Sequence, residues 1–300
     1  MRPRGFVADP FGVVAGGDQQ DRGGIDTNTV TGEQRGCGLG DELAEHDVEG
    51  VHVVADRECA STEGPHREFR RAQDRVTGPG AERGRASGEV LAYLNADEQY
   101  LPGALKQVHD FFAVHPSVDV LLSDTVVTDS AGDYICHRYS LVPKKNQMWV
   151  RFPALTCALF LRRRVVFEAG IRFDTRWRAL GDWFWVKAMI DHGLQFAILP
   201  ELTSVFTDTG ENMMFKPHAR QEQRDKWQMA PAWVRLLKYA MIAWYRVRLG
   251  ARGAFSTRPF DYSLYTLATP SQRVIRHASK PTSFWKGRLG QVFGPTAGEG

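Results

Sequence analysis

The most restrictive feature of this 300-residue chain is a change of composition near Arg85. Residues 1–86 hold 15 of the 29 glycines, contain no Lys, Tyr or Trp, and have Leu39 and Leu43 as their only leucines. A segment so poor in large apolar side chains cannot offset the conformational entropy that folding removes. Its one strand-like run, Val51 to Ala55, is too short for a core. We therefore expect the folded part to lie after residue 86.

Three interpretations of residues 1–86 compete. The segment is a disordered extension, a folded domain whose pattern is not recognisable, or the product of a reading-frame error in a GC-rich gene. A frame error in such a gene would enrich Arg, Gly, Ala, Asp and Pro and deplete Lys and Tyr, as seen here. We favour this third interpretation, and we divide the chain into residues 1–86, a domain at 87–230 and a basic helical region with a tail at 231–300.

Bulk properties exclude several classes of protein. The net charge is +3, and the basic residues are not interleaved with a nucleic-acid reader motif, so no nucleic-acid partner is expected. No run of 18 uncharged apolar residues exists, and no apolar segment follows the basic N-terminus, so neither a membrane-spanning helix nor a signal peptide is expected. The four cysteines lack CxxC spacing, which argues against a zinc site or a disulfide framework and favours the cytoplasm.

After residue 86, strand-like and helix-like patterns alternate, which predicts an α/β fold. Asp129 to Asp133 is typical of a hairpin turn. The expected strands are Gly88–Leu94, Val118–Leu122, Ala154–Leu161 and Leu194–Leu199. The expected helices begin near Pro102, at Arg163 and at Trp183, and Gly170 and Gly193 end the last two.

Acidic residues follow the first of these strands and precede the last of these helices. Asn95, Asp97 and Glu98 lie where ligands bind in open α/β sheets, and paired carboxylates suit a hard divalent cation. Asp182, beside Trp183, suits a general base at the edge of an apolar pocket. The structural alternative is that Asp97 or Glu98, and likewise Asp182, only caps the helix that follows it.

The sequence from Ser87 to Leu105, SGEVLAYLNADEQYLPGAL, resembles the middle motif of family 2 glycosyltransferases. The resemblance continues in order through Val118 to Gly132, then through LTCALFLRRRVVFEAG at 155–170. It ends with Phe173-Asp174, the GDWFW element at 181–185, and a loop at 206–212. The matched landmarks cover about 130 residues in the family's order.

This resemblance implies a GT-A type fold, with a mixed sheet flanked by helices. It also implies transfer of a sugar, with inversion, from a nucleotide-sugar donor to an acceptor hydroxyl. By position, Asp97 would meet the metal–diphosphate, with Asn95 and Glu98 flanking it and Glu98 as a second ligand of Mg²⁺ or Mn²⁺. Asp182 would deprotonate the acceptor. Glu98 stands where the family usually has Asp, and Thr209 stands where many members have His. By family analogy, the product is a cell-surface or secreted polysaccharide.

Nothing in residues 1–86 matches the family's base- and ribose-binding half. Codons that permit Gly78 to Gly84 also permit, one nucleotide out of frame, Asp-Gln-Ala-Leu-Asn-Ala-Gly, which fits the "A-x-N-x-G" that the family shows just before Ser87. We therefore expect the chain as written to have little or no transferase activity. The rival hypothesis is a non-catalytic binding or scaffold protein with a disordered arm.

Residues 231–252 combine a helical face of Trp233, Leu237, Met241 and Trp244 with the basic residues Arg235, Lys238, Arg246 and Arg248. One interpretation is a helix that lies on an anionic membrane surface near a lipid-linked acceptor. It would place a cytoplasmic protein at the inner face of the cell membrane. The other is a helix packed on the domain with a solvated basic side. The sequence leaves both open.

Overall fold

The structure is a computed structural model that describes residues 51–55, 88–95, 97–174, 176–209, 217–255 and 258–285, with backbone only at 51–55. The prediction for residues 1–86 therefore lies outside the described residues, apart from that one strand. The strands are β1 Val51–Ala55, β2 Val90–Leu94, β3 Glu98–Tyr100, β4 Val120–Asp129, β5 Tyr134–Arg138, β6 Leu159–Arg162, β7 Phe196–Asp208, β8 Phe260–Thr266 and β9 Thr269–Ala278. The helices are α2 Ala104–Val114, α3 Arg163–Phe167, α4 Gly181–Asp191, α5 Pro217–Met229, α6 Ala232–Leu236 and α7 Lys238–Ala251, with 3₁₀ turns η2 Gln147–Trp149 and η3 Thr156–Ala158.

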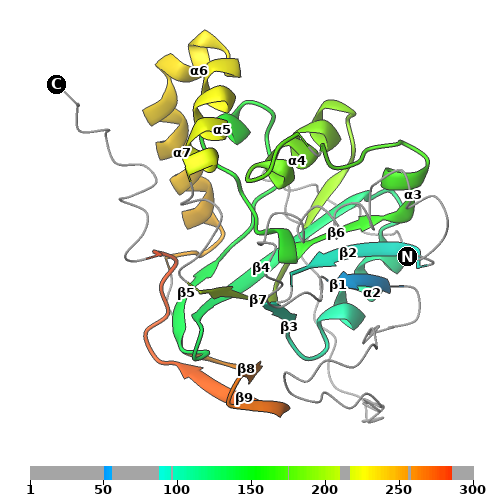
Figure 1. The fold of residues 1–300 in the computed structure, drawn as a ribbon, viewed down its shortest axis with the longest axis vertical. Helices are drawn as coiled ribbons and strands as arrows, with labels where there is room; N and C mark the ends of the chain where they lie inside the picture. The colour runs from blue at the N-terminus through cyan, green and yellow to red at the C-terminus, as the bar shows by residue number, and fades with distance from the viewer. Residues whose placement is uncertain are drawn as a thin grey trace, which may run out of the picture.

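The main sheet is mixed, which confirms the α/β class predicted from the sequence (Figure 1). Over the described residues its strand order is β1-β2-β6-β4-β7-β3, and β5 pairs with the second half of β4. The β1–β2 and β4–β7 pairs are parallel, whereas β2–β6, β4–β6, β4–β5 and β3–β7 are antiparallel. The run at 51–55 thus forms a strand, as its pattern indicated, and it extends the sheet beyond β2.

Helices cover both faces of this sheet. Successive side chains of each strand point to opposite faces, so the hydrophobic core is divided into two clusters, one on each face. Leu91 and Leu122 face one side, where α3 and α4 contribute Val165, Trp183 and other buried side chains. Leu121 lies on the opposite face of the sheet and packs against α2. The buried residues of α2 are Ala104, Leu105, Val108, Phe111 and Phe112. These α2 residues recur three or four positions apart, which is the spacing of one helical face.

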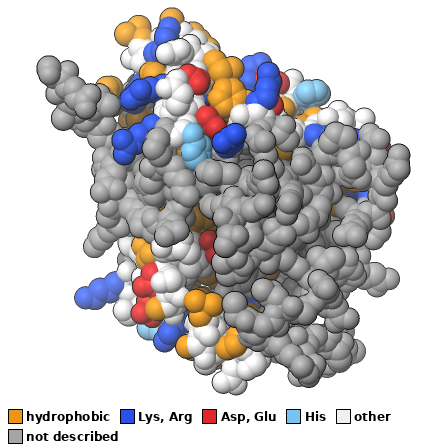
Figure 2. All heavy atoms as spheres, viewed as in Figure 1, with side chains coloured by type: hydrophobic (Ala, Val, Ile, Leu, Met, Phe, Trp, Pro, Cys, Tyr) orange, Lys and Arg blue, Asp and Glu red, His pale blue; other side chains and the backbone are white. Residues whose placement is uncertain are grey.

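The C-terminal region differs from the single helix predicted for 231–252. Leu237 ends α6 and begins α7, so the segment is two helices. The β8–β9 hairpin, which the sequence pattern did not signal, follows and packs through Tyr262 and Leu264 on Val126 of β4. Helices α5 to α7 form one end of the molecule and the hairpin lies toward the other (Figure 1). Basic and hydrophobic side chains gather at the helical end (Figure 2).

No helix among the described segments has the length and apolar character needed to cross a bilayer.

The β4–β5 turn is held closely against the hairpin, and this predicts a specific sensitivity at Gly132. Gly132 has φ of +83°, and a β-carbon there would come within 3.0 Å of Leu264 Cδ1 and 3.1 Å of Thr266 Cγ2. Gly193 has φ of +74° with open space around it. Gly132→Ala should therefore lower the free energy of unfolding by more than the roughly 1–2 kcal/mol that a positive φ alone costs. Gly193→Ala is the control for backbone strain, and equal losses in urea titrations of the two variants would contradict the close approach.

Candidate functional site

The first part of the site is the turn that follows β2. Asn95 and Glu98 close this turn reciprocally: Glu98 N–H donates to Asn95 O at 3.0 Å, and Asn95 N–H donates to Glu98 Oε2 at 2.8 Å. Tyr93 Oη donates to Asn95 Oδ1 at 2.8 Å. The N-cap of α2 is Gly103, which makes no side-chain capping bond. Neither Asp97 nor Glu98 therefore caps that helix, and the structural alternative for this pair is not observed.

Asp97 and Glu98 point into different environments. Glu98 is only 7% exposed, and its strand β3 pairs with β7 opposite Phe206. Burial, with smaller contributions from the charges of Asp97 and Asp182, raises the pKa of the Glu98 carboxyl to about 8. Asp97 keeps an exposed surface, although partial desolvation raises its pKa as well. At neutral pH the buried Glu98 is therefore mostly protonated, and Asp97 is the carboxylate that faces solvent.

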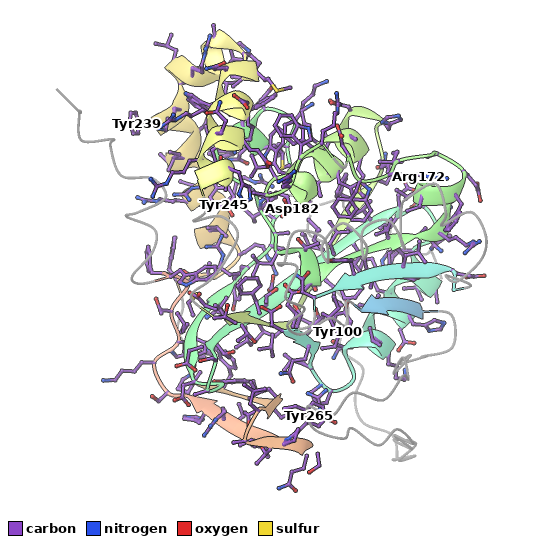
Figure 3. The ribbon with its side chains drawn as sticks, viewed as in Figure 1. Tyr100, Arg172, Asp182, Tyr239, Tyr245 and Tyr265 are labelled. Carbon is purple, nitrogen blue, oxygen red and sulfur yellow. The ribbon has the colours of Figure 1, made fainter. Side chains whose placement is uncertain are left out.

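The second part of the site is the start of α4, where Asp182 lies (Figure 3). The N-cap position is Leu180, so Asp182 belongs to the first turn of the helix and is not its cap. Its Oδ1 accepts from Trp183 N–H at 2.7 Å, and its Oδ2 accepts from Thr156 Oγ1 at 3.3 Å. Burial raises the pKa of Asp182 to about 6, and these two hydrogen bonds oppose the rise. The carboxyl thus titrates near the pH at which a general base is useful.

Two residues of α5 complete this part of the site, and neither belongs to a motif recognisable in the sequence. Glu222 caps the chain entering α4 from outside: its Oε1 accepts from Arg178 N–H at 2.8 Å, and its Oε2 accepts from Ala179 and Leu180 N–H at 2.9 and 3.0 Å. One turn later on α5, Lys226 Nζ lies 5.3 Å from the Trp183 ring centroid. Burial lowers the pKa of Lys226 to about 8, and the charge of Asp182 opposes that fall. A carboxylate and an ammonium at i and i+4 on α5 therefore bracket the start of α4.

Glu98 lies within electrostatic reach of both Asp97 and Asp182, because the charges of both raise its pKa. Among the described residues, no group of three His, Cys, Asp or Glu side chains is arranged to hold a metal ion. Mg²⁺ commonly uses one or two protein carboxylates and takes its other ligands from phosphates and water, so Asp97 alone fits such an ion. Glu98 already accepts Asn95 N–H through Oε2. Its part as a second metal ligand stays a prediction.

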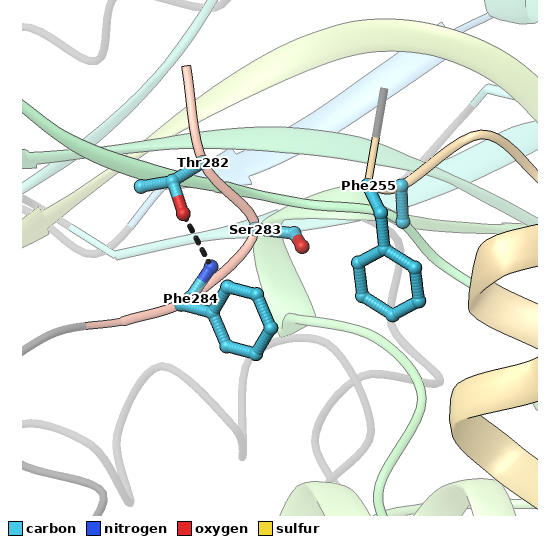
Figure 4. A pocket seen from close by; sticks show the side chains of 5 residues that line it. Phe255, Thr282, Ser283 and Phe284 are labelled. Atoms are coloured by element: carbon cyan, nitrogen blue, oxygen red, sulfur yellow. Dashed lines mark hydrogen bonds between the residues drawn. The ribbon is translucent and has the colours of Figure 1, made fainter. Parts of the chain in front are cut away.

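A small cavity of about 200 Å³ lies elsewhere in the C-terminal region. Ala254, Phe255, Thr282, Ser283 and Phe284 line it, and the Phe255 and Phe284 rings stack with centroids 5.9 Å apart (Figure 4). It shares no residue with the Asp97–Asp182 site, and its lining offers no titratable side chain.

Comparisons with known proteins give distant structural matches. Neither a protein-family model nor a curated protein sequence matches this chain. Among solved structures, S. aureus TarS 1–349 with UDP matches at 15% identity and a TM-score of 0.34, over 63% of this chain and 52% of that one. The same protein with UDP-GlcNAc matches at 17% identity and 0.36, over 63% and 53%. Longer S. aureus TarS matches at 17% and 0.34, over 64% and 33%. The chain spans about half the length of TarS 1–349, and TM-scores this low support no inference about function.

The buried Glu98 predicts a pH dependence of stability. The pKa of Glu98 in the folded protein, about 8, exceeds the ordinary value of 4.5. The contribution of Glu98 to the free energy of unfolding is therefore most favourable below pH 4.5 and is lost as the pH rises to about 8. Glu98→Gln cannot ionise, and its Oε1 can still accept Asn95 N–H. In metal-free buffer the melting temperature of the variant should therefore rise relative to wild type across this window, by at least about 2 °C. Parallel melting curves from pH 4.5 to 8 would contradict the burial of this carboxyl.

The Glu222 clamp predicts a loss of stability that its helix neighbours do not share. Glu222→Gln replaces one accepting oxygen by an NH₂ group that faces backbone donors. Hydrogen bonds to a charged group contribute about 1.5–3 kcal/mol when buried. Because Glu222 is half-buried, we expect a loss of about 1–2 kcal/mol in the free energy of unfolding. Arg224→Gln, at an exposed position of the same helix, is the matched control and should be close to neutral.

Proposed function

We propose that this protein is built to transfer a sugar from a nucleotide-activated donor to an acceptor hydroxyl, with Asp182 as the general base. The observation that carries the proposal is the position of the half-buried Asp182 in the first turn of α4, where its charge reaches Glu98 of the turn that follows β2. The resemblance of these two segments to family 2 glycosyltransferases gives the reaction class. The polymer assignment, a cell-surface or secreted polysaccharide, rests on family analogy alone.

The chemistry follows from the charges at this site. At neutral pH Asp182 is largely ionised, and it sits in the first turn of α4, where the helix dipole favours a carboxylate. As the acceptor oxygen bonds to the anomeric carbon, its proton passes to Asp182 and the bond to the diphosphate breaks. Attack from the face opposite the diphosphate inverts the anomeric centre. The nearby Lys226 favours the ionised base before the proton moves.

A divalent cation, Mg²⁺ or Mn²⁺, is part of the proposal. Asp97 would hold it from the exposed side of the turn, with the donor's diphosphate as its other anionic ligand. When bound, it would neutralise the charge that builds on the leaving diphosphate. Asn95, held by Tyr93 and by the turn, would keep Asp97 in place.

The substitution Asp182→Asn tests directly whether Asp182 is the general base. In a version of the gene whose neighbouring frame restores the donor half, Asp182→Asn should lower kcat about 10²- to 10⁴-fold, the usual contribution of a general base. The affinity for the donor should be unchanged, because the substitution keeps the shape of the side chain. Asp191→Asn, at the other end of α4, is the matched control and should retain turnover. Full activity in Asp182→Asn would sink the assignment.

A scaffold function remains the second candidate, because no segment of residues 1–86 matches the donor-binding half of the family. Calorimetric titration of the chain as written with UDP, GDP and dTDP, with and without MgCl₂, separates the two functions. Metal-dependent binding that Asp97→Asn weakens supports the transferase. Absence of binding by both the written and the frame-restored chains favours the scaffold. Strong turnover by the written chain would contradict our expectation that it is inactive.

A further inference from the structure

Helices α6 and α7 present large apolar side chains to solvent. Leu236 is 81% exposed, Tyr239 78% and Val247 57%. Trp233, Leu237 and Trp244 are each close to half exposed. We call these six residues the outer apolar face. Single exposed apolar residues are ordinary on protein surfaces, but six on two consecutive short helices form a patch of the kind that marks a binding surface.

The side of α7 that faces the domain combines polar anchors with the half-buried Met241 and Leu249. Tyr245 and Arg248 are buried, and Arg252 follows them at helical spacing. Arg248 donates to Gln147 Oε1 at 2.5 Å and to Val142 O at 2.8 Å. Arg252 makes a two-pronged ion pair with Asp124 of β4, with both N–O distances at 2.9 Å. Figure 3 labels Tyr239 on the outer side of α7 and Tyr245 nearer the sheet. These polar anchors fix the rotation of the helix, so the apolar residues cannot turn inward.

All charged residues in and around α6 and α7 are basic. From Lys226 to Phe260 the sequence holds seven Lys and Arg residues and no Asp or Glu. Lys226, Arg248 and Arg252 are engaged within the protein, whereas Arg235 and Arg246 are exposed and Lys238 is half-buried among the aromatic rings of Trp227 and Tyr239. Three cations therefore stand beside the outer apolar face, and Figure 2 shows basic and hydrophobic side chains together at this end of the molecule.

From this arrangement we infer that the outer apolar face docks on the surface of an anionic lipid bilayer. Tryptophan and tyrosine prefer the depth of the lipid headgroups, leucine and valine reach the acyl boundary, and the long basic side chains reach the phosphates. Each Lys or Arg near an anionic bilayer adds to the attraction. The face lies on helices that stand at one end of the molecule's long axis, which suits contact with a plane (Figure 1).

A second copy of this chain suits the face less well. A two-fold symmetric contact sets the same patch against itself. It would bring Arg235, Lys238 and Arg246 close to their counterparts, and the segment from Lys226 to Phe260 offers no carboxylate to neutralise them. The basic charge therefore disfavours self-association and favours an anionic partner. Docking on lipid does not depend on the proposed sugar transfer, because none of the six residues belongs to the Asp97–Asp182 site.

Co-sedimentation of the chain as written with vesicles tests the inference without any nucleotide sugar. Vesicles of phosphatidylcholine with phosphatidylserine are compared with phosphatidylcholine alone, at low and high salt. We expect binding to the anionic vesicles only. Arg235→Glu/Lys238→Glu/Arg246→Glu should weaken it by roughly a hundredfold, from the loss of three attractive charges. Leu236→Ser/Leu237→Ser should weaken it at least about tenfold, because two apolar side chains no longer leave water.

The control variant is Lys106→Glu/Arg258→Glu/Lys280→Glu, which changes the net charge equally at exposed positions outside α6 and α7. Retained binding in this control, with loss in both test variants and unchanged melting temperatures, supports the docking surface. Equal loss in the control, binding to neutral vesicles that ignores charge reversal, or no binding by the wild type would overturn it. Light scattering on lipid-free protein adds one more outcome. A dimer that Leu236→Ser/Leu237→Ser converts to monomer would assign the face to self-association and also overturn the inference.

Discussion

The ion pair between Asp124 and Arg252 sets the arrangement of the C-terminal half. Asp124 lies in β4, a strand buried along nearly its whole length, and is itself only 3% exposed. Burial raises its pKa to about 6 even though the Arg252 guanidinium opposes the rise. A buried carboxylate without a partner would cost several kcal/mol, so the sheet requires a cation at this point. Arg252 supplies it from the turn after α7, and α7 must therefore turn its polar side toward the sheet. The exposure of its apolar side follows from that requirement.

The position of Asp182, the candidate base, likewise depends on buried contacts made by other residues. Asp182 is one residue into α4, and the position of α4 is fixed by buried aromatic side chains: Trp183 Nε1 donates to Met148 O at 2.9 Å, and Trp185 Nε1 donates to Ile171 O at 3.1 Å. The chain entering the helix is held by Glu222 of α5. Because α5 supplies both this clamp and Lys226, movement of one helix would change the position of Asp182 and its electrostatic surroundings together. The link between α5 and the site is therefore mechanical as well as electrostatic.

The sequence was informative where a pattern is local. The strand expected at 88–94 is present at Val90–Leu94, the helix expected near Pro102 begins at Ala104, and the hairpin turn expected at Asp129–Asp133 joins β4 to β5. Residues 154–161 were expected to be a strand, but β6 begins only at Leu159, because residues 156–158 form η3, from which Thr156 reaches Asp182. The roles of Glu222 and Lys226 could not be predicted, since α5 has no apolar stripe and its partners lie about 40 residues away along the chain. The β8–β9 hairpin was missed for a related reason: its strands are mostly exposed on one side and depend on Val126 and Val205 for their burial.

The separation of roles among the carboxyls is the remaining argument for a reactive site. When neighbouring acids meet different environments, their pKa values move apart, and each is then suited to a different task. Glu98, buried at the sheet, has its pKa raised to about 8 and serves the turn through Asn95. Asp182 has two hydrogen bonds and the charge of Lys226 to oppose its burial, so its pKa rises only to about 6. A mostly neutral Glu98 adds little repulsion at pH 7, so Asp182 can hold its negative charge. The contacts of Asp182 with Trp183, Thr156 and Lys226 thereby leave one half-buried carboxylate largely ionised and able to take a proton.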